Sequence, residues 1–401
     1  MKYIIEIIEI FVVKLYNISE VIMITVRQIS NKRDYKRFVK FPTKLYKNNP
    51  NYIPPMESDE YKMTTKKNAH YDECDQAYFL AENDKGEVVG RIACLVMHPY
   101  NKKNNSKYAR FTRFDFINSE EVAHLLLKTA EDWAREQGME FIHGPLGYDD
   151  LEREGLLTFG FENKGSYITG YNEPYYQTYV ESYGYKPDAK WVEWRLSFPQ
   201  PIDERVERVS NIVEKRYGFH EKEYKNVNEI IKHHGDDFFD LLDETFVELY
   251  GTFPFNAELR KQVISMFKLI LDKRYICLVF DKNEKLCGFG LTWPSLADAM
   301  KETNGRALPF GFIKWLKAIK KPNAVELGII SVKKEYQKLG VTAFIIKNLL
   351  GRLGKIPTIK YADTGVQLET NTGAIRSLEM FDRKLIRKRT CYIKNLNEKS
   401  N

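Results

Sequence analysis

The chain is poor in the residues that build metal centres and disulfide frameworks. It has five cysteines and seven histidines in 401 residues. The cysteine count is odd, the cysteines are scattered along the chain and no Cys-x-x-Cys pair is present. These features exclude a zinc ribbon or a disulfide scaffold and indicate buried thiols in a reducing compartment. We therefore expect a cytoplasmic protein with no metal cofactor.

Long apolar runs are also missing. The first 22 residues are rich in Ile, Val and Phe, but Lys2, Glu6 and Glu9 interrupt them. The segment is too charged to span a bilayer, and it lacks the basic start and small-residue cleavage site of a signal peptide. We interpret residues 1–22 as an amphipathic extension or a start-codon artefact, with domain structure beginning near Met23. No other segment predicts a membrane span.

A strong excess of one charge is absent as well. The net charge of +7 is modest for this length; it suits an anionic cofactor and does not indicate a nucleic-acid partner. The basic clusters Arg383-Lys384 and Arg387-Lys388-Arg389 predict a solvated strand face, with a phosphate contact as the alternative. A length of 401 residues and a hydrophobic content of 43% favour a globular protein of two domains.

What the sequence does have is one strand, turn and helix near its C-terminal end. Residues 325–332 read as a strand, Gly340 lies in the turn, and an apolar helix follows to Leu350. The first backbone N–H groups of such a helix have no partner within the helix, and the helix dipole adds positive charge there. The pattern predicts a site for a diphosphate-sized anion, with a helix start that binds nothing as the alternative.

Other elements of the second half surround this unit. Asp281 to Glu284 form a polar turn between two strand-like runs, which predicts a β-hairpin. A segment from Ser295 to Lys320, with two helix-like stretches, separates the hairpin from the strand at 325–332. The elements predicted downstream are a strand at 358–362 that extends as far as Leu368, a helix from Asn371 to Lys384 and a final strand at 386–396. The predicted order is β-hairpin, β, α, β, α, β.

The first half repeats this order of elements without repeating the amino-acid sequence. Ser119 is expected to cap a helix to Gln137, with Gly138 as its stop. The other elements expected here are strands at 24–30, 77–82, 88–97, 110–117 and 139–143, helices at 33–46 and 173–183, and a strand at 191–198 that closes the half. Pro199 and Pro201 then break the chain, and a helix at 203–217 leads into the second half. We therefore divide the chain into residues 1–22, 23–200 and 201–401.

The pattern Gln337-x-x-Gly340-x-Thr342-Ala343 resembles the pyrophosphate-binding loop of the GNAT acyltransferase superfamily. The element order and the Asn371-x-x-Ala374 helix start are similar to that family over about residues 217–396. Separated matches in both halves, such as His143-Gly144-Pro145, resemble a family of bacterial tandem GNAT-like proteins. The resemblance implies an α/β fold with mixed sheets, built from two tandem acyl-CoA N-acyltransferase (GNAT-like) domains.

The resemblance also implies the site. Acetyl-CoA or a longer acyl-CoA would bind to the second half through the strand, the loop and the following helix. The implied cofactor-binding residues are Leu327, Ile329, Ile330, Val332, Gln337, Lys338, Leu339, Gly340, Val341, Thr342, Ala343 and Asn371. The first half passes from Ile117 through Asn118 and Ser119 straight into its helix. Because it lacks the glycine-bearing turn, we expect this degenerate half not to bind CoA there.

Two residues are expected to carry the chemistry. Glu326 is the only carboxylate on its strand and is the predicted base; Glu369 is the second choice, and a surface role is the alternative. In the family a tyrosine that protonates the thiolate follows the Asn by seven residues. Leu378 occupies that position here. Tyr361 on the neighbouring strand is the predicted substitute, with a packing role as its alternative.

The predicted function is N-acyl transfer to a small-molecule or peptide amine, with the first half shaping the acceptor site. Three alternatives stay open. The protein would be an acyl-CoA sensor without turnover, an aminoacyl transferase of the FemABX kind, or a structural remnant that serves protein contacts. The sequence does not predict an acceptor, an acyl length or an oligomeric state.

Overall fold

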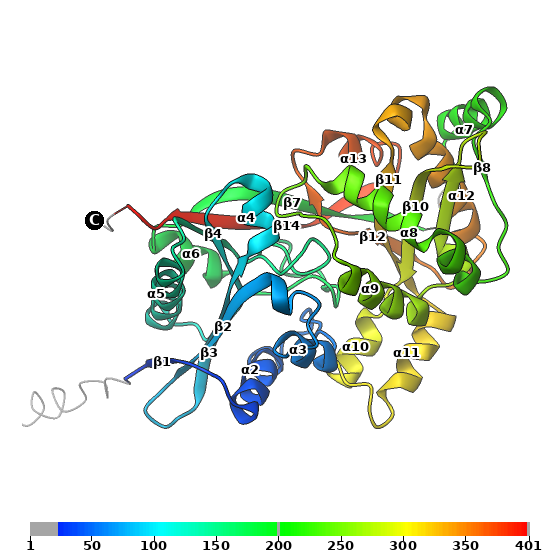
Figure 1. Cartoon of the computed structure of the whole chain (residues 1–401). Coiled ribbons are helices and arrows are strands. Elements are labelled where there is room, and N and C mark those ends of the chain that lie inside the picture. The colour runs from blue at the N-terminus through cyan, green and yellow to red at the C-terminus, as the bar shows by residue number, and fades with distance from the viewer. Residues whose placement is uncertain (1–22, 199–200, 399–401) are drawn as a thin grey trace, which may run out of the picture.

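The computed structural model describes residues 23–198 and 201–398. The predicted extension at 1–22 and Pro199 of the predicted break lie outside these residues. One mixed sheet runs through both halves of the molecule in the order β1-β2-β3-β4-β5-β14-β7-β12-β11-β10-β9-β8. Two short strands lie off this path, with β6 paired to β14 and β13 paired to β7. Figure 1 shows helices packed around this sheet in both halves.

The first half follows the predicted order closely. Its elements are β1 (Thr25–Gln28), α2 (Lys32–Leu45), α3 (Glu57–Met63), η1 (Tyr71–Glu73), β2 (Cys74–Glu82), β3 (Val88–Met97), α4 (His98–Asn104), β4 (Tyr108–Phe116), α5 (Glu120–Glu136), β5 (Phe141–Gly144), β6 (Leu156–Phe159), α6 (Tyr175–Ser182) and β7 (Lys186–Ser197). Ser119 caps α5 as predicted, because its hydroxyl accepts the backbone N–H of Val122. The buried face of α5, which includes Leu126 and Ala130, joins one apolar core with β3 and β4.

The second half adds two helices that the sequence did not show. Its elements are α7 (Glu204–Tyr217), β8 (His220–Glu221), α8 (Val227–Phe246), α9 (Ala257–Ile270), η2 (Lys273–Tyr275), β9 (Ile276–Phe280), β10 (Leu286–Pro294), α10 (Ala297–Thr303), α11 (Gly311–Lys320), β11 (Ala324–Val332), η3 (Lys334–Leu339), α12 (Val341–Leu353), β12 (Tyr361–Thr364), β13 (Gln367–Leu368), α13 (Thr372–Arg376) and β14 (Arg383–Asn395). The helices missed are α8 and α9, which follow the short strand β8.

The predicted helix from Asn371 to Lys384 is wrong in length. The helix α13 ends at Arg376, and turns follow until β14 begins at Arg383. These turns place Leu378 and Phe381 in a buried apolar cluster. Strand pairing from Arg383 onward therefore takes residues that the local pattern assigned to a helix.

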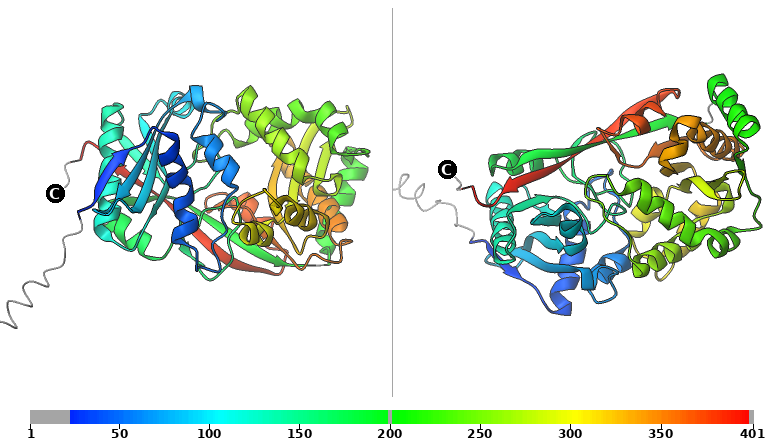
Figure 2. Two further views of the ribbon diagram at one scale, coloured as in Figure 1. Left: turned by 90° about the horizontal axis from the view of Figure 1, so that it is seen from below. Right: turned by 45° about the horizontal axis from the view of Figure 1, so that its top comes forward.

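The two halves exchange their last strands. The strand β7 of the first half pairs with β12, β13 and β14, which all belong to the second half. In return β14 pairs with β5 and β6 of the first half. Figure 2 shows β7 and β14 running together from one half of the molecule to the other. The strand expected at 191–198 is β7, which begins earlier, at Lys186, and takes its partners from the second half.

Buried charges hold β7 and β14 together. Glu193 of β7 lies opposite Arg387 of β14 and accepts hydrogen bonds from Arg387 Nε (2.8 Å) and Arg389 Nε (2.7 Å). All three side chains are almost fully buried. Burial alone would raise the pKa of Glu193, but the two guanidinium groups hold it below its ordinary value. The prediction of a solvated strand face is thus wrong for these two arginines, because the sequence does not show that Glu193 lies across from them.

The strand β11 has a bulge on one edge and is unpaired along part of its other edge. Pairing with β10 shifts register between Leu291 and Thr292, which leaves Gly328 as the extra residue. A Cβ atom on Gly328 would lie 2.0 Å from the ring of Trp293, so only glycine fits there. On its other edge β11 pairs with β12 only as far as Leu327 and Thr364. Beyond Leu327, no described strand lies beside this edge of β11.

The substitution Glu193→Gln tests the link between the halves. It removes the carboxylate that accepts hydrogen bonds from both buried guanidinium groups, and the other ion pair of Arg387, with Asp363, is longer at 4.0 Å. We therefore expect a loss of about 3–5 kcal/mol in the free energy of unfolding. Chemical denaturation measures this loss. The exposed Glu223→Gln is the control and should change stability by less than about 0.5 kcal/mol. Equal stability of the two variants would contradict the role of Glu193.

The substitution Gly328→Ala tests the bulge. The added methyl group would collide with the Trp293 indole, and we expect a cost of about 1–3 kcal/mol together with a changed tryptophan emission spectrum. Gly365→Ala is the matched control, because the nearest atom to its Cβ would be 3.5 Å away. An unchanged denaturation midpoint for Gly328→Ala would show that Trp293 is free to move aside.

Candidate active site

A cavity of about 550 Å³ lies between the two halves, along the open edge of β11. The first half contributes a loop that includes Ser166 and Thr169, and the second half contributes β11, α9 and α12. Most of the wall is apolar. The apolar side chains on it include Leu151, Ile168, Leu196, Phe246, Leu249, Met266, Phe267, Ile270, Leu291, Trp293, Leu327, Ile329, Ile346, Leu349, Leu350, Leu368, Leu378 and Phe381. Such a wall favours a ligand with a large apolar part.

The open edge of β11 brings several predicted cofactor residues together. Leu327, Ile329, Ile330 and Val332 all line the cavity. The backbone of this strand is paired with β10 on one side and open to the cavity on the other. An open strand edge presents N–H and C=O groups that an extended amide-bearing ligand can pair with, as an added strand would.

The start of α12 lies at one end of this edge. Gly340 adopts a left-handed conformation (φ +89°), which breaks η3 and starts α12. The backbone N–H of Ala343 donates to Gly340 O at 2.9 Å. Val341 is fully buried, whereas Thr342 lines the cavity. Because the start of a helix carries partial positive charge, the first turn of α12 beside Thr342 favours an anion in the cavity.

The side chains of the predicted loop have different surroundings. Gln337 and Thr342 line the cavity, and Gln337 Nε2 donates to the carbonyl of Val332 at 3.0 Å. Leu339 packs with a buried cluster between α7 and α12, and Val341 belongs to that cluster. Lys338 is exposed. Asn371 also lines the cavity, where its side chain accepts the backbone N–H of Ala374 and caps α13.

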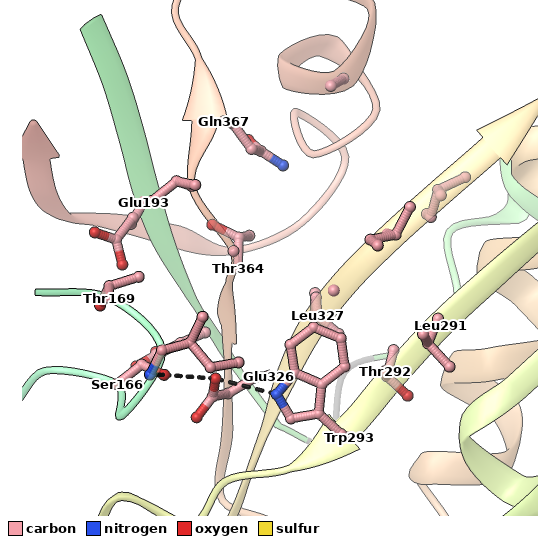
Figure 3. Close-up of a pocket in the computed structure, with 18 of the residues that line it drawn as sticks. Ser166, Thr169, Glu193, Leu291, Thr292, Trp293, Glu326, Leu327, Thr364 and Gln367 are labelled. Carbon is pink, nitrogen blue, oxygen red and sulfur yellow. Dashed lines mark hydrogen bonds between the residues drawn. The ribbon is translucent and has the colours of Figure 1, made fainter. Parts of the chain in front are cut away.

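Glu326 lies on the cavity wall just before β11 and β12 separate, and it is 7% exposed. Its carboxylate accepts hydrogen bonds from Ser166 Oγ at 2.7 Å, Ser295 Oγ at 3.0 Å and Trp293 Nε1 at 3.2 Å. Figure 3 shows Ser166 and Trp293 on opposite sides of this carboxylate. Burial raises the pKa of Glu326, although these donors favour the charged form. A carboxylate with a raised pKa is suited to accept a proton.

Tyr361 and Leu378 also lie on the cavity wall. The guanidinium of Arg195 stacks on the Tyr361 ring, 4.1 Å from its centre. Burial and the nearby carboxylate of Asp363 raise the pKa of Tyr361, which keeps the phenol protonated. Leu378, at the position where the family has a tyrosine, is a buried apolar residue in a cluster with Phe381.

The structure adds polar residues that the sequence did not identify. Asp150, Glu154, Thr169, Glu193 and Gln367 line the cavity. In the described chain Thr169 Oγ1 and Gln367 Oε1 have no hydrogen-bond partner, and Figure 3 shows both beside the cavity. Burial raises the pKa of Glu154, and the neighbouring Asp150 adds to the shift. These residues lie on loops and strands without a motif, and the fold places them on the wall of one cavity.

In the first half, tyrosines fill the corresponding place. Only Ile117, Asn118 and Ser119 separate β4 from α5, as the sequence indicates. The hydroxyl of Tyr175 donates to Phe116 O at 2.8 Å, and that of Tyr179 donates to Asn118 Oδ1 at 2.7 Å. The rings of Tyr175, Tyr176 and Tyr179 all pack against Phe116. These tyrosines form an aromatic packing face at the end of β4.

No group of three or more His, Cys, Asp or Glu side chains among the described residues is arranged to hold a metal ion. None of the helices in residues 23–198 and 201–398 is long and apolar enough to cross a membrane.

Known proteins of similar sequence are distant. Protein YghO of Escherichia coli (strain K12) is 25% identical over 366 residues, which cover 88% of this chain and 91% of that protein. A bacterial ceramide synthase of Caulobacter vibrioides is 23% identical over 328 residues, 78% of this chain and 82% of that protein. No family model matches the chain.

Solved structures of similar shape agree on the fold. A tandem GNAT protein from the clavulanic acid biosynthesis pathway aligns with a TM-score of 0.55 at 10% identity, over 94% of this chain and 100% of its own length. A GCN5-related N-acetyltransferase from Sphaerobacter thermophilus aligns with a TM-score of 0.50 at 10% identity, over 94% and 97% of the two chains. The predicted fold is therefore confirmed: the chain has the fold of the tandem GNAT proteins.

Proposed function

We propose that the protein is an acyl-CoA-dependent N-acyltransferase whose second half binds the CoA thioester. One observation carries the proposal. A single cavity joins the first turn of α12 at Thr342, the open edge of β11 and the buried carboxylate of Glu326. The diphosphate would bind at the start of α12 beside Thr342, and the pantetheine amides would pair with β11. The thioester would then lie near Glu326.

The apolar wall favours a long acyl chain over an acetyl group. One of the relatives is named as a ceramide synthase, and a ceramide is the amide of a fatty acid with a long-chain amino alcohol. We propose an acceptor of the same chemical class for this chain, an amphipathic amine that carries hydroxyl groups. Thr169 Oγ1 and Gln367 Oε1, which lack partners within the described chain, would bind its polar end.

The proposed reaction needs little covalent help, because the thioester is already activated. Glu326 takes a proton from the ammonium or the attacking amine, the C–N bond forms and the C–S bond breaks. A free N–H group on the open edge of β11 stabilises the oxyanion. The phenol of Tyr361 gives its proton to the leaving thiolate. Positioning of both substrates in one cavity supplies much of the rate increase.

A sensor that binds acyl-CoA without turnover is the second candidate. The observation that favours it is Leu378, an apolar residue where the family has its proton donor. Release of free thiol in the presence of long-chain amino alcohols separates the two candidates, because a sensor releases none.

The substitution Thr342→Asp tests the cofactor site. A carboxylate in the first turn of α12 suits the helix dipole, so the fold should be kept, but it repels a diphosphate bound there. We expect calorimetry to show a loss of affinity for long-chain acyl-CoA of about tenfold or more. Thr342→Asn is the neutral control of equal shape and should bind as the wild type does. Equal affinity of the two variants would remove the cofactor assignment.

The substitution Glu326→Gln tests the base. Burial raises the pKa of Glu326 above its ordinary value of 4.5, so the activity of the wild type should be full above the raised pKa and fall as pH drops through it. We expect Glu326→Gln to lose about 10²–10⁴-fold in kcat/KM and to lose this acid limb. Glu369→Gln is the control, since Glu369 lies outside the cavity lining. An unchanged acid limb in Glu326→Gln would assign the base to another group.

A further inference from the structure

Exposed apolar side chains gather on the segment between β10 and β11. Leu308 is 78% exposed and Phe310 is 72% exposed, just before α11. Phe312, Ile313 and Leu316 on α11 are exposed as well. We call these five residues the docking face. A soluble surface tolerates single apolar residues, but five within nine positions mark a contact site.

The docking face is the outer side of a helix whose inner side is already packed. Trp315 is buried, and its Nε1 donates to Thr303 Oγ1 of α10 at 3.0 Å. Ala318 and Ile319 pack against the same core cluster. The core therefore explains one side of α11 and leaves the apolar residues on the other side without a partner in the described chain.

Positive charge surrounds the docking face. Lys314, Lys317, Lys320 and Lys321 are exposed. Among the described residues only Lys314 of these four forms an ion pair, with Glu302 at 2.9 Å. The combination of apolar side chains with lysines that lack counter-charges is the pattern of a helix that lies in the surface of an anionic bilayer.

The docking face is connected to the cavity through α10. α11 packs against α10, and Ala297 at the start of α10 lines the cavity together with Ser295 and Tyr361. Figure 1 shows α10 and α11 side by side below α9, with α10 facing α3 of the first half. Met266 of α9 lines the cavity too. The segment thus lies between the exposed face and the candidate active site.

We propose that α11 and the turn before it bind the surface of an anionic lipid bilayer. The docking face enters the acyl region, and Lys317, Lys320 and Lys321 bind lipid phosphates. No membrane-spanning helix is needed for this mode of binding. The proposal goes beyond the N-acyltransferase assignment and stands without it. If that assignment also holds, amphipathic substrates reach the cavity from the bilayer and not from water.

Sedimentation of the full-length chain with vesicles tests this proposal. The probes are vesicles of phosphatidylcholine alone and vesicles with an equal part of phosphatidylglycerol. We expect the wild type to bind the anionic vesicles and to release them as salt rises. Phe310→Ser/Ile313→Ser should reduce binding about tenfold or more, because it removes apolar area from the inserted face. Lys317→Gln/Lys320→Gln/Lys321→Gln should lose the preference for phosphatidylglycerol.

A matched control uses exposed apolar residues elsewhere. Phe159→Ser/Ile212→Ser changes one exposed Phe on β6 and one exposed Ile on α7, and it should bind vesicles as the wild type does. Circular dichroism confirms that each variant is folded. Failure of the wild type to bind anionic vesicles, or equal binding by the two double variants, overturns the proposal.

A wild-type dimer that Phe310→Ser/Ile313→Ser dissociates, without vesicle binding by either protein, makes the docking face a contact between copies and also overturns the proposal. Calorimetry with acyl-CoA needs no vesicles. Failure of bilayer binding is therefore distinguishable from failure of the N-acyltransferase assignment.

Discussion

The antiparallel pairing of β7 with β14 is the constraint on which the rest of the structure depends. It exchanges the last strands of the two halves and fuses them into one sheet. Glu193 between Arg387 and Arg389 fixes the register, because a slip by one residue would bury these charges without partners. Glu193 also lines the cavity, so the ion pairs that join the halves form part of the wall of the candidate site.

The two halves have similar folds but contribute different groups to the cavity. In the first half, tyrosines form hydrogen bonds to the end of β4, the place where the second half has its open strand edge. The linker from β4 to α5 contains no glycine. In the second half β11 keeps its open edge. The first half supplies Ser166 to the carboxylate of Glu326 and the polar atoms of Thr169 to the cavity. Neither half alone holds the full set of groups that the proposed reaction uses.

Local patterns in the sequence predicted many of the elements, although not α8 and α9, and predicted their partners poorly. The cap at Ser119, the strand β11 and the start of α12 rest on residues close together in the chain, and all three are confirmed. The strand exchange, the burial of Arg387 and Arg389 and the position of Thr169 and Gln367 on one cavity wall depend on pairings between distant segments. The shortened α13 belongs to the same class, since pairing of β14 overrides the local helical pattern. The cavity-lining position of Glu326 and Tyr361 agrees with the sequence, and their catalytic roles stay predictions.

The apolar cavity and the docking face both affect how a long-chain substrate moves from a bilayer into the protein. A long-chain substrate that leaves a bilayer through water exposes its chain at a cost of about 0.8 kcal/mol for each CH₂ group. A cavity with an apolar wall returns that free energy on binding, but it does not lower the barrier of transfer. An entrance held at the bilayer surface does lower it, because the chain then passes from one apolar environment to another. The lysines beside Phe310 and Ile313 would hold the segment next to the cavity at that surface. The N-acyltransferase proposal thus provides a binding site for the chain, and the bilayer proposal provides its route to that site. Each proposal stands on its own observations.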